Sequence, residues 1–167
     1  MRLLLSCLFG VRCFVPAIAA GQARGRADNG ASTIRACALL TRELARKTTP
    51  YEGQALQLFL KSSPEPEEDT LGAGGSDCSY LGIDLLIDPR FSFETFRSQK
   101  DWEQAERVGG LGDEALFHDN IGEWAELVVR SGSHLLAIRM DVPRGKTAAS
   151  IKPNVVALAK ALLPNLK

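Results

Sequence analysis

The sequence has no excess of charge of either sign. Its 167 residues include 20 Lys and Arg and 20 Asp and Glu, so the formal net charge is zero. Without the first 19 residues, 18 basic and 20 acidic groups remain, because Arg2 and Arg12 are removed and no acid is. A chain with this balance has no global basic field to recruit nucleic acid or acidic lipid. We therefore expect no nucleic-acid partner.

Histidine is scarce, and the common catalytic motifs are missing. The two histidines, His118 and His134, are expected at opposite ends of a strand over Trp124–Arg130. At about 3.3 Å per residue they would lie more than about 20 Å apart, too far to share one metal ion. No G-x-S-x-G motif is present, and no serine has a recognisable oriented base. We expect neither enzymatic activity nor a metal or cofactor.

The chain also lacks an unbroken apolar run that could cross a membrane. Spanning takes about 20 apolar residues, and Arg12 interrupts the N-terminal apolar stretch. A basic start, an apolar region and the small residues Ala17-Ile18-Ala19 are instead typical of a secretory signal. We predict a signal peptide over 1–19, a flexible segment over 20–32, and a periplasmic or secreted protein without stable membrane insertion. The alternative is a lipoprotein anchored through Cys7, although only six residues precede that cysteine.

Cysteines are few, and export would leave two of the four. Cys7 and Cys13 lie in the predicted signal peptide, so only Cys37 and Cys78 remain. In an oxidising compartment these two can form one disulfide, which closes a loop of about 40 residues and stabilises the fold by roughly 4 kcal/mol. Two unpaired, buried thiols are the alternative if the chain is not exported.

The N-terminal half of the predicted domain contains local signals for four segments. Thr41 is a good N-cap for a short helix that Pro50 would stop. Alternating leucines predict a strand over Gln54–Lys61. The prolines, acids and glycines of Ser62–Gly75 predict a long mobile loop, and Cys78–Ile87 reads as the next strand.

The C-terminal half predicts helices at both ends and strands between them. Ser92 can cap a helix that reaches Val108, and a second helix is expected over Thr147–Leu163. Three strands are expected between these helices: Glu114–His118, Trp124–Arg130 and Leu135–Asp141. This order of elements predicts one α+β domain over residues 33–167, with a mainly antiparallel sheet of about five strands and helices packed on it.

One glycine-rich segment is a candidate for binding. It consists of Gly109, Gly110, Gly112, Asp113 and Glu114. A strand rather than a helix is expected after it, so it does not match a phosphate-binding loop, and its simplest role is to end a helix with a turn of positive φ. A hydrolase or other enzyme with a non-standard site around Asp113 and Glu114 is the alternative to a non-enzymatic role.

The aromatic residues are the other candidate for binding. They could line a groove for an apolar ligand or belong to the core, and the core is favoured because large aromatics dominate domain interiors. The set comprises Tyr80, Phe91, Phe93, Phe96, Trp102, Phe117 and Trp124.

Three short motifs occur in a distinctive order. They are Cys37-Ala38-Leu39-Leu40-Thr41, Cys78-Ser79-Tyr80 and Val108-Gly109-Gly110-Leu111-Gly112-Asp113-Glu114-Ala115. The chain thereby resembles a family of small exported bacterial proteins and lipoproteins of uncharacterised function. The resemblance implies that Cys37 pairs with Cys78 and that the fold is an αβα sandwich similar to the PsbP-like fold, and the family gives no catalytic residues to carry over. It implies a non-catalytic envelope module that binds a protein or a small apolar ligand.

Overall fold

The computed structural model describes most of the chain after residue 33. The ranges described are 34–62, 65–71, 75–88, 92–99, 102–120 and 122–166. They belong to one unit, Ala31–Lys167. The predicted signal peptide (1–19), the segment 20–32, Cys7, Cys13 and Phe91 lie outside the described residues.

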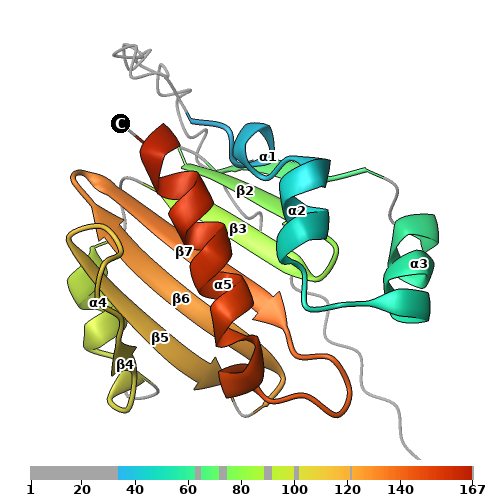
Figure 1. Ribbon diagram of the computed structural model, residues 1–167. Coiled ribbons are helices and arrows are strands. Elements are labelled where there is room, and N and C mark those ends of the chain that lie inside the picture. Colours follow the sequence, from blue (N-terminus) through green and yellow to red (C-terminus); the bar gives the residue numbers. More distant parts are fainter. Residues whose placement is uncertain are drawn as a thin grey trace, which may run out of the picture. The chain divides into compact units, whose positions relative to one another are not determined.

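A single antiparallel sheet of seven strands organises the domain (Figure 1). The strands are β1 (Glu67–Leu71), β2 (Gly75–Tyr80), β3 (Ile83–Asp88), β4 (Glu106–Arg107), β5 (Glu114–Asn120), β6 (Trp124–Ser131) and β7 (His134–Asp141). Their spatial order is β1-β2-β3-β7-β6-β5-β4, so β7 inserts beside β3 and joins the two halves of the sheet. The predicted α+β class is confirmed, and the sheet is larger than the five strands expected.

In the residues that the structure describes, five α-helices accompany the sheet. They are α1 (Ala36–Leu39), α2 (Arg42–Thr48), α3 (Gly53–Ser62), α4 (Phe93–Arg97) and α5 (Ala148–Leu162), the last followed by a 3-10 turn over Leu163–Asn165. Thr41 and Ser92 cap α2 and α4 as predicted, each accepting a backbone N–H bond. Thr147 caps α5 in a capping box with Ser150, which places the start of this helix where the sequence predicted it.

The main core lies between α5 and the inner face of the sheet. Helix α5 runs across β5, β6 and β7 in Figure 1 and contacts all three. Its residues Ile151, Val155, Leu158 and Leu162 recur at helical spacing and are almost fully buried. Alternate strand residues such as Leu85 meet them from the sheet. The opposite face is covered in part by α4 and by Trp102, so the sheet has an inner face toward α5 and an outer face toward α4.

The disulfide between Cys37 and Cys78 is present, as predicted. It joins α1 to β2, with the two Cα atoms 5.0 Å apart. Neighbouring polar contacts add to this link: the hydroxyl of Ser76 on β2 accepts from the N–H of Ala36 on α1 at 2.9 Å and donates to Glu68 on β1 at 3.0 Å. The first helix is thus fixed to the sheet by one covalent bond and a chain of hydrogen bonds.

Two predictions for the N-terminal half were wrong. Gln54–Lys61 is part of helix α3 rather than a strand, because Leu56, Phe59 and Leu60 follow a helical spacing and are the residues that pack on the core. The leucine between them, Leu58, is left 61% exposed. The predicted loop over Ser62–Gly75 contains strand β1, whose acidic side chains are compatible with the exposed edge of a sheet.

Two further predicted elements were too long, because each continued past a turn of the chain. Cys78–Ile87 is a hairpin rather than one strand, because Leu81 and Gly82 both have positive φ and turn the chain between β2 and β3. The helix that begins after Ser92 ends at Arg97 and does not reach Val108. The chain turns there so that Trp102 can pack against the outer face, and the short strand β4 follows.

Candidate functional site

The glycine-rich segment forms the turn between β4 and β5. Gly110 and Gly112 have φ of 75° and 52°, the left-handed region that favours glycine. A Cβ atom on Gly112 would lie 2.3 Å from the carbonyl oxygen of Arg130. This glycine therefore allows the turn to approach strand β6 closely. Because β4 precedes the turn, the glycines do not end a helix, contrary to the expectation from the sequence.

Asp113 fastens this turn to the neighbouring hairpin. Its backbone N–H donates to the carbonyl oxygen of Arg130 at 2.8 Å. Its side chain accepts from the N–H of Gly132 at 2.8 Å, in the turn between β6 and β7. Both contacts join local backbone segments, so the geometry of Asp113 is that of a structural bridge.

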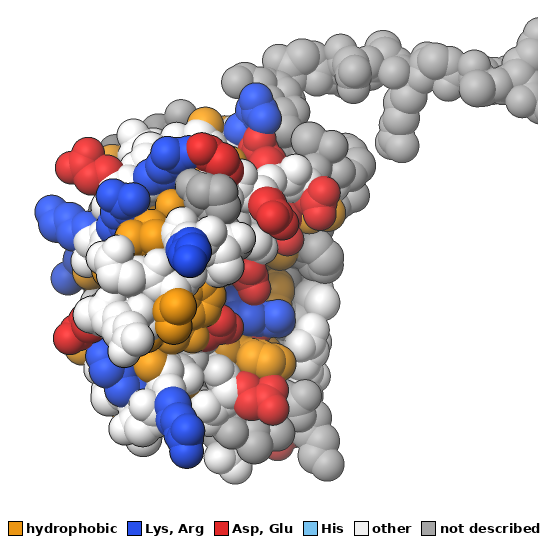
Figure 2. Space-filling view, turned by 90° about the vertical axis from the view of Figure 1, so that its right-hand side faces the viewer, with side chains coloured by type: hydrophobic (Ala, Val, Ile, Leu, Met, Phe, Trp, Pro, Cys, Tyr) orange, Lys and Arg blue, Asp and Glu red, His pale blue; other side chains and the backbone are white. Residues whose placement is uncertain are grey.

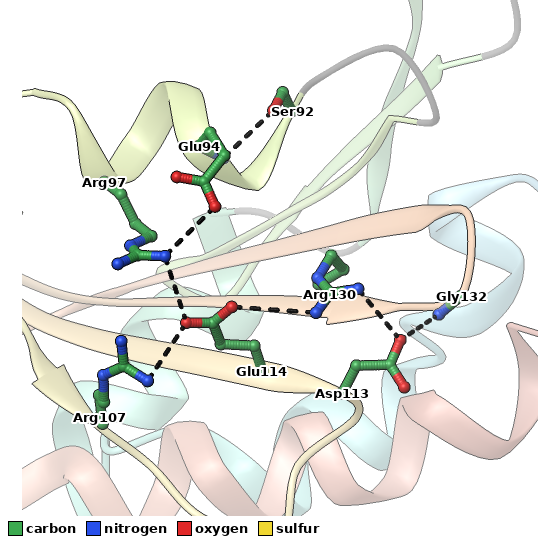
Figure 3. A network of polar contacts seen from close by, with 8 residues as sticks. All are labelled: Ser92, Glu94, Arg97, Arg107, Asp113, Glu114, Arg130 and Gly132. Carbon is green, nitrogen blue, oxygen red and sulfur yellow. Dashed lines mark hydrogen bonds and ion pairs between the residues drawn. The ribbon is translucent and has the colours of Figure 1, made fainter.

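Glu114 lies among three arginines from three different elements (Figure 3). The shortest distances from its carboxylate are 3.6 Å to Arg107 on β4, 3.9 Å to Arg97 on α4 and 3.9 Å to Arg130 on β6. Arg97 also donates a hydrogen bond of 3.2 Å to Glu94, which lies three residues earlier on α4. The glutamate is 19% exposed while its three arginine partners are more exposed, so the network links four elements at the surface around one half-buried carboxylate.

A recess of about 350 Å³ opens beside this network. Glu114, Arg130, Ser133 and His134 are among its lining residues. In the described part of the chain, however, the polar contacts of Glu114 are the three arginine ion pairs, and no hydrogen bond joins it to a serine or a histidine. The arrangement does not form a nucleophile with an oriented base.

A second recess, of about 280 Å³, lies on the outer face of the sheet. We call it the outer-face recess. Its lining residues come from β2, β3, β6 and β7 and from the segment around α4: Asp77, Ser79, Asp84, Leu86, Phe96, Trp102, Glu126, Val128, Ala137, Ile138 and Arg139. The outer-face recess has charged groups and apolar surface close together.

Charged side chains cross the outer face in one line, which we call the polar row. The register places Ser79, Asp84, Arg139, Glu126 and His118 directly opposite one another on β2, β3, β7, β6 and β5. The contacts along it are a hydrogen bond of 2.6 Å from Ser79 to Asp84 and one of 3.0 Å from Arg139 to Glu126. His118 approaches the same glutamate at 3.6 Å. Toward one end of the polar row Glu126 is thus paired with Arg139, and toward the other end the acid Asp84 accepts a hydrogen bond from Ser79.

An apolar row runs beside the polar row. Leu86, Ala137 and Val128 lie opposite one another on β3, β7 and β6, and Asp77 of β2 ends the row. Trp102 is 7% exposed and closes the other end, where it stacks on His118 and meets Phe96 edge to face. The floor of the recess is therefore apolar, with a carboxylate at one end and an indole at the other.

Asp77 is the least satisfied polar group of the recess. Its Oδ1 atom is buried and has no hydrogen-bond partner. Burial, and then the nearby carboxylates of Asp84 and Asp69, raise the pKa of Asp77, while the N–H of Cys78 and the charge of Arg139 oppose the rise. Burial and Asp84 likewise raise the pKa of Asp141, which ends β7. A further negative charge near these carboxylates would therefore be electrostatically unfavourable.

Sequence reasoning did not single out the acids and the arginine of this recess. A local signal exists. Asp84, Glu126 and Arg139 each have an apolar residue on either side in their own strand, and these flanking residues face the core. That pattern identifies outward-facing charges, but their alignment depends on the register of distant strands. Of the aromatic candidates, Phe96 and the buried Trp102 line the outer-face recess and Phe93 lines the first recess, whereas Tyr80 and Phe117 belong to the main core.

The two histidines are well separated. His118 lies opposite Glu126 and His134 lies opposite Ser131, so five residues of β6, or about 17 Å, separate their positions along the sheet. His118 lies inside β5 rather than at a strand end. In the ranges that the structure describes, no group of three or more His, Cys, Asp or Glu side chains is placed to hold a metal ion.

Comparison with known proteins finds no similar family model, curated protein or solved structure. No helix in the described part of the chain is both long enough and apolar enough to cross a membrane.

Proposed function

We propose that this chain is an exported, non-catalytic module that binds a small molecule in the outer-face recess. The observation that carries the proposal is the combination of an apolar floor, a tryptophan wall and a few charged groups around one hollow. Ligand sites in proteins typically have this composition, with apolar surface for affinity and a few polar groups for orientation. A volume of about 280 Å³ fits a small ligand.

Export is part of the same proposal. The Cys37–Cys78 disulfide supports an oxidising compartment such as the periplasm or the extracellular space. The N-terminal signal pattern, with Ala17 and Ala19 at the expected cleavage positions, supports the same location. The likeness to the exported envelope family and to the PsbP-like sandwich also belongs to this proposal, and helices on both faces of the sheet support it.

A variant that fills the recess tests the proposal. Ala137 lies in the middle of the apolar row, so Ala137→Phe should occupy the hollow and abolish binding. Ala157→Phe is the matched control, because this alanine is exposed on α5. A library of small fragments would be screened against all three proteins by ligand-observed NMR. Fragments should bind the parent and the control but not Ala137→Phe, whereas no binding, or binding that Ala137→Phe leaves unchanged, would overturn the proposal.

Helix α3 favours a second candidate function, the binding of a partner protein. None of its residues is buried, and Leu58 is 61% exposed. Figure 2, which faces the side of the molecule that carries α3, shows apolar side chains at the surface among acidic and basic ones. A photo-crosslinker in place of Leu58 should capture one defined envelope protein in cells, and the same group in place of Ala157 should not. Equal labelling from both positions would exclude this surface.

A further inference from the structure

The charges of the outer-face recess are unequal. Its described lining residues include three carboxylates, from Asp77, Asp84 and Glu126, and one guanidinium, from Arg139. Arg139 already binds Glu126 at 3.0 Å and lies 4.6 Å above the ring of Trp124. In the described part of the chain, Asp77 and Asp84 form no ion pair of their own. The end of the recess at β2 and β3 therefore has an excess of negative charge, which Arg139 opposes only in part.

The position of Asp77 makes that end a receptor for a donor. Its Oδ1 atom is buried without a hydrogen-bond partner, although buried polar atoms in folded proteins are almost always paired. Asp84 lies one strand away and accepts a hydrogen bond from Ser79 at 2.6 Å. Two neighbouring carboxylates repel each other, and a positively charged donor between them removes this repulsion.

The rest of the recess favours an apolar body behind the charged group. From Asp77 the floor continues over Leu86 and Ala137 to Val128, and three strand spacings make this row about 14 Å long. At its far end stand Trp102 and Phe96, whose rings contact each other edge to face. Aromatic rings bind flat apolar groups and also tolerate a nearby cation.

We propose that the outer-face recess binds a small organic cation, an amine with a flat apolar body, with its ammonium group on Asp77 and Asp84 and its body over the apolar row toward Trp102. This assignment rests on the proposed small-molecule function and adds the chemical class of the ligand. An anionic ligand is disfavoured because it would meet two carboxylates that form no ion pair in the described part of the chain. A neutral apolar ligand would leave the repulsion between these carboxylates in place.

Three probes of one size and shape separate these classes. Phenethylamine is a cation at pH 7, phenethyl alcohol is neutral, and phenylacetate is an anion. Titration calorimetry should show that the amine binds the parent protein at least about tenfold more tightly than the alcohol, because a charge-assisted hydrogen bond is stronger than a neutral one. Phenylacetate should bind most weakly. Added salt should weaken the binding of the amine more than that of the alcohol.

Two variants assign the preference to the site. Asp77→Asn keeps the shape of the side chain and removes its charge, so it should bring the affinity for the amine down to that for the alcohol. Glu43→Gln is the control, because Glu43 is an exposed acid on α2 and its loss changes the net charge of the protein equally. Thermal melting of each variant, compared with the parent, checks that the fold is kept.

The outcomes distinguish the ligand class from the proposed function. Equal binding of amine and alcohol, both abolished by Ala137→Phe, would overturn the cation assignment and leave a small-molecule site. Tightest binding of phenylacetate would overturn it as well, and so would an unchanged preference for the amine in Asp77→Asn. If none of the three probes binds and the fragment screen is also negative, the proposed function itself is overturned. A tenfold preference for the amine, lost in Asp77→Asn and kept in Glu43→Gln, supports both.

Discussion

The indole of Trp102 stacks on the imidazole of His118, with ring centroids 5.0 Å apart and planes inclined by 25°. Trp102 belongs to the segment after α4, and His118 to β5, so the stack fixes an irregular segment on the outer face of the sheet. The same indole packs with Leu116, Val128 and Leu135 in the smaller apolar cluster. One side chain thereby stabilises the outer layer and forms a wall of the recess.

Replacement of Trp102 should therefore affect stability and binding together. We expect Trp102→Ala to lower the free energy of unfolding by about 3–5 kcal/mol, because it removes a buried aromatic side chain and leaves a cavity. Trp102→Phe should lose less, because it keeps an aromatic cover on Val128. Denaturant unfolding of both variants measures the difference. A loss below about 1 kcal/mol for Trp102→Ala would show that the outer layer does not depend on this residue.

The disulfide should contribute a comparable amount by a different mechanism. Cys37 and Cys78 are separated by 41 residues, and closing a loop of that length stabilises the native state by roughly 4 kcal/mol on the chain-entropy model. We expect Cys78→Ala to lower the melting temperature markedly, and a reducing agent to do the same to the parent protein. The reducing agent should have no effect on the double variant Cys37→Ala/Cys78→Ala. An unchanged melting temperature of the reduced parent would contradict this prediction.

The parts of the fold that the sequence predicted well have local signals. Thr41, Ser92 and Thr147 are N-caps whose side chains bind the first turn of a helix, and such contacts span only a few residues. Strands β5, β6 and β7 are short segments rich in apolar residues between turn formers, so each is recognisable without its neighbours. The ends of these three strands shifted by no more than two residues.

The parts that it missed depend on tertiary contacts. Leu56, Leu58 and Leu60 alternate as in a strand, while Leu56, Phe59 and Leu60 recur as in a helix, and only packing on the core selects the second pattern. The outer-face recess was missed for a related reason. Asp84 and Glu126 are 42 residues apart in the chain, and the register of β3 and β6 against β7 is what places both beside Arg139.

The two glycines of the β4–β5 turn should respond differently to the same substitution. Gly110 and Gly112 both have positive φ, which costs an alanine about 1–2 kcal/mol. Only Gly112 is crowded, since a Cβ atom there would lie 2.3 Å from a backbone oxygen, whereas nothing lies within 4 Å at Gly110. We expect Gly112→Ala to lower the free energy of unfolding by at least about 3 kcal/mol. Gly110→Ala should lower it only by the roughly 1–2 kcal/mol that a positive φ costs an alanine. Equal losses in denaturant unfolding would show that the turn can move away from β6.

The buried carboxylate of Asp77 should make stability depend on pH in an unusual direction. Its pKa is raised in the folded protein by burial and by Asp84 and Asp69, and Arg139 opposes the rise. In the unfolded chain an aspartate titrates near the ordinary value of about 3.9. Between these two pKa values the folded state binds more protons than the unfolded state, so the contribution of Asp77 to stability falls as the pH rises through this window.

Asp77→Asn should remove that contribution. At pH values above the raised pKa of the folded state, where Asp77 is ionised in both states, the variant should be more stable than the parent, because it no longer buries a charged group. The advantage should shrink as the pH falls toward about 4 and disappear below it, where the aspartate is protonated in both states. Denaturant unfolding of the two proteins at a series of pH values measures this difference. A variant that is less stable than the parent at pH 7 would show that the ionised carboxylate of Asp77 stabilises the fold through its contacts with Cys78 and Arg139.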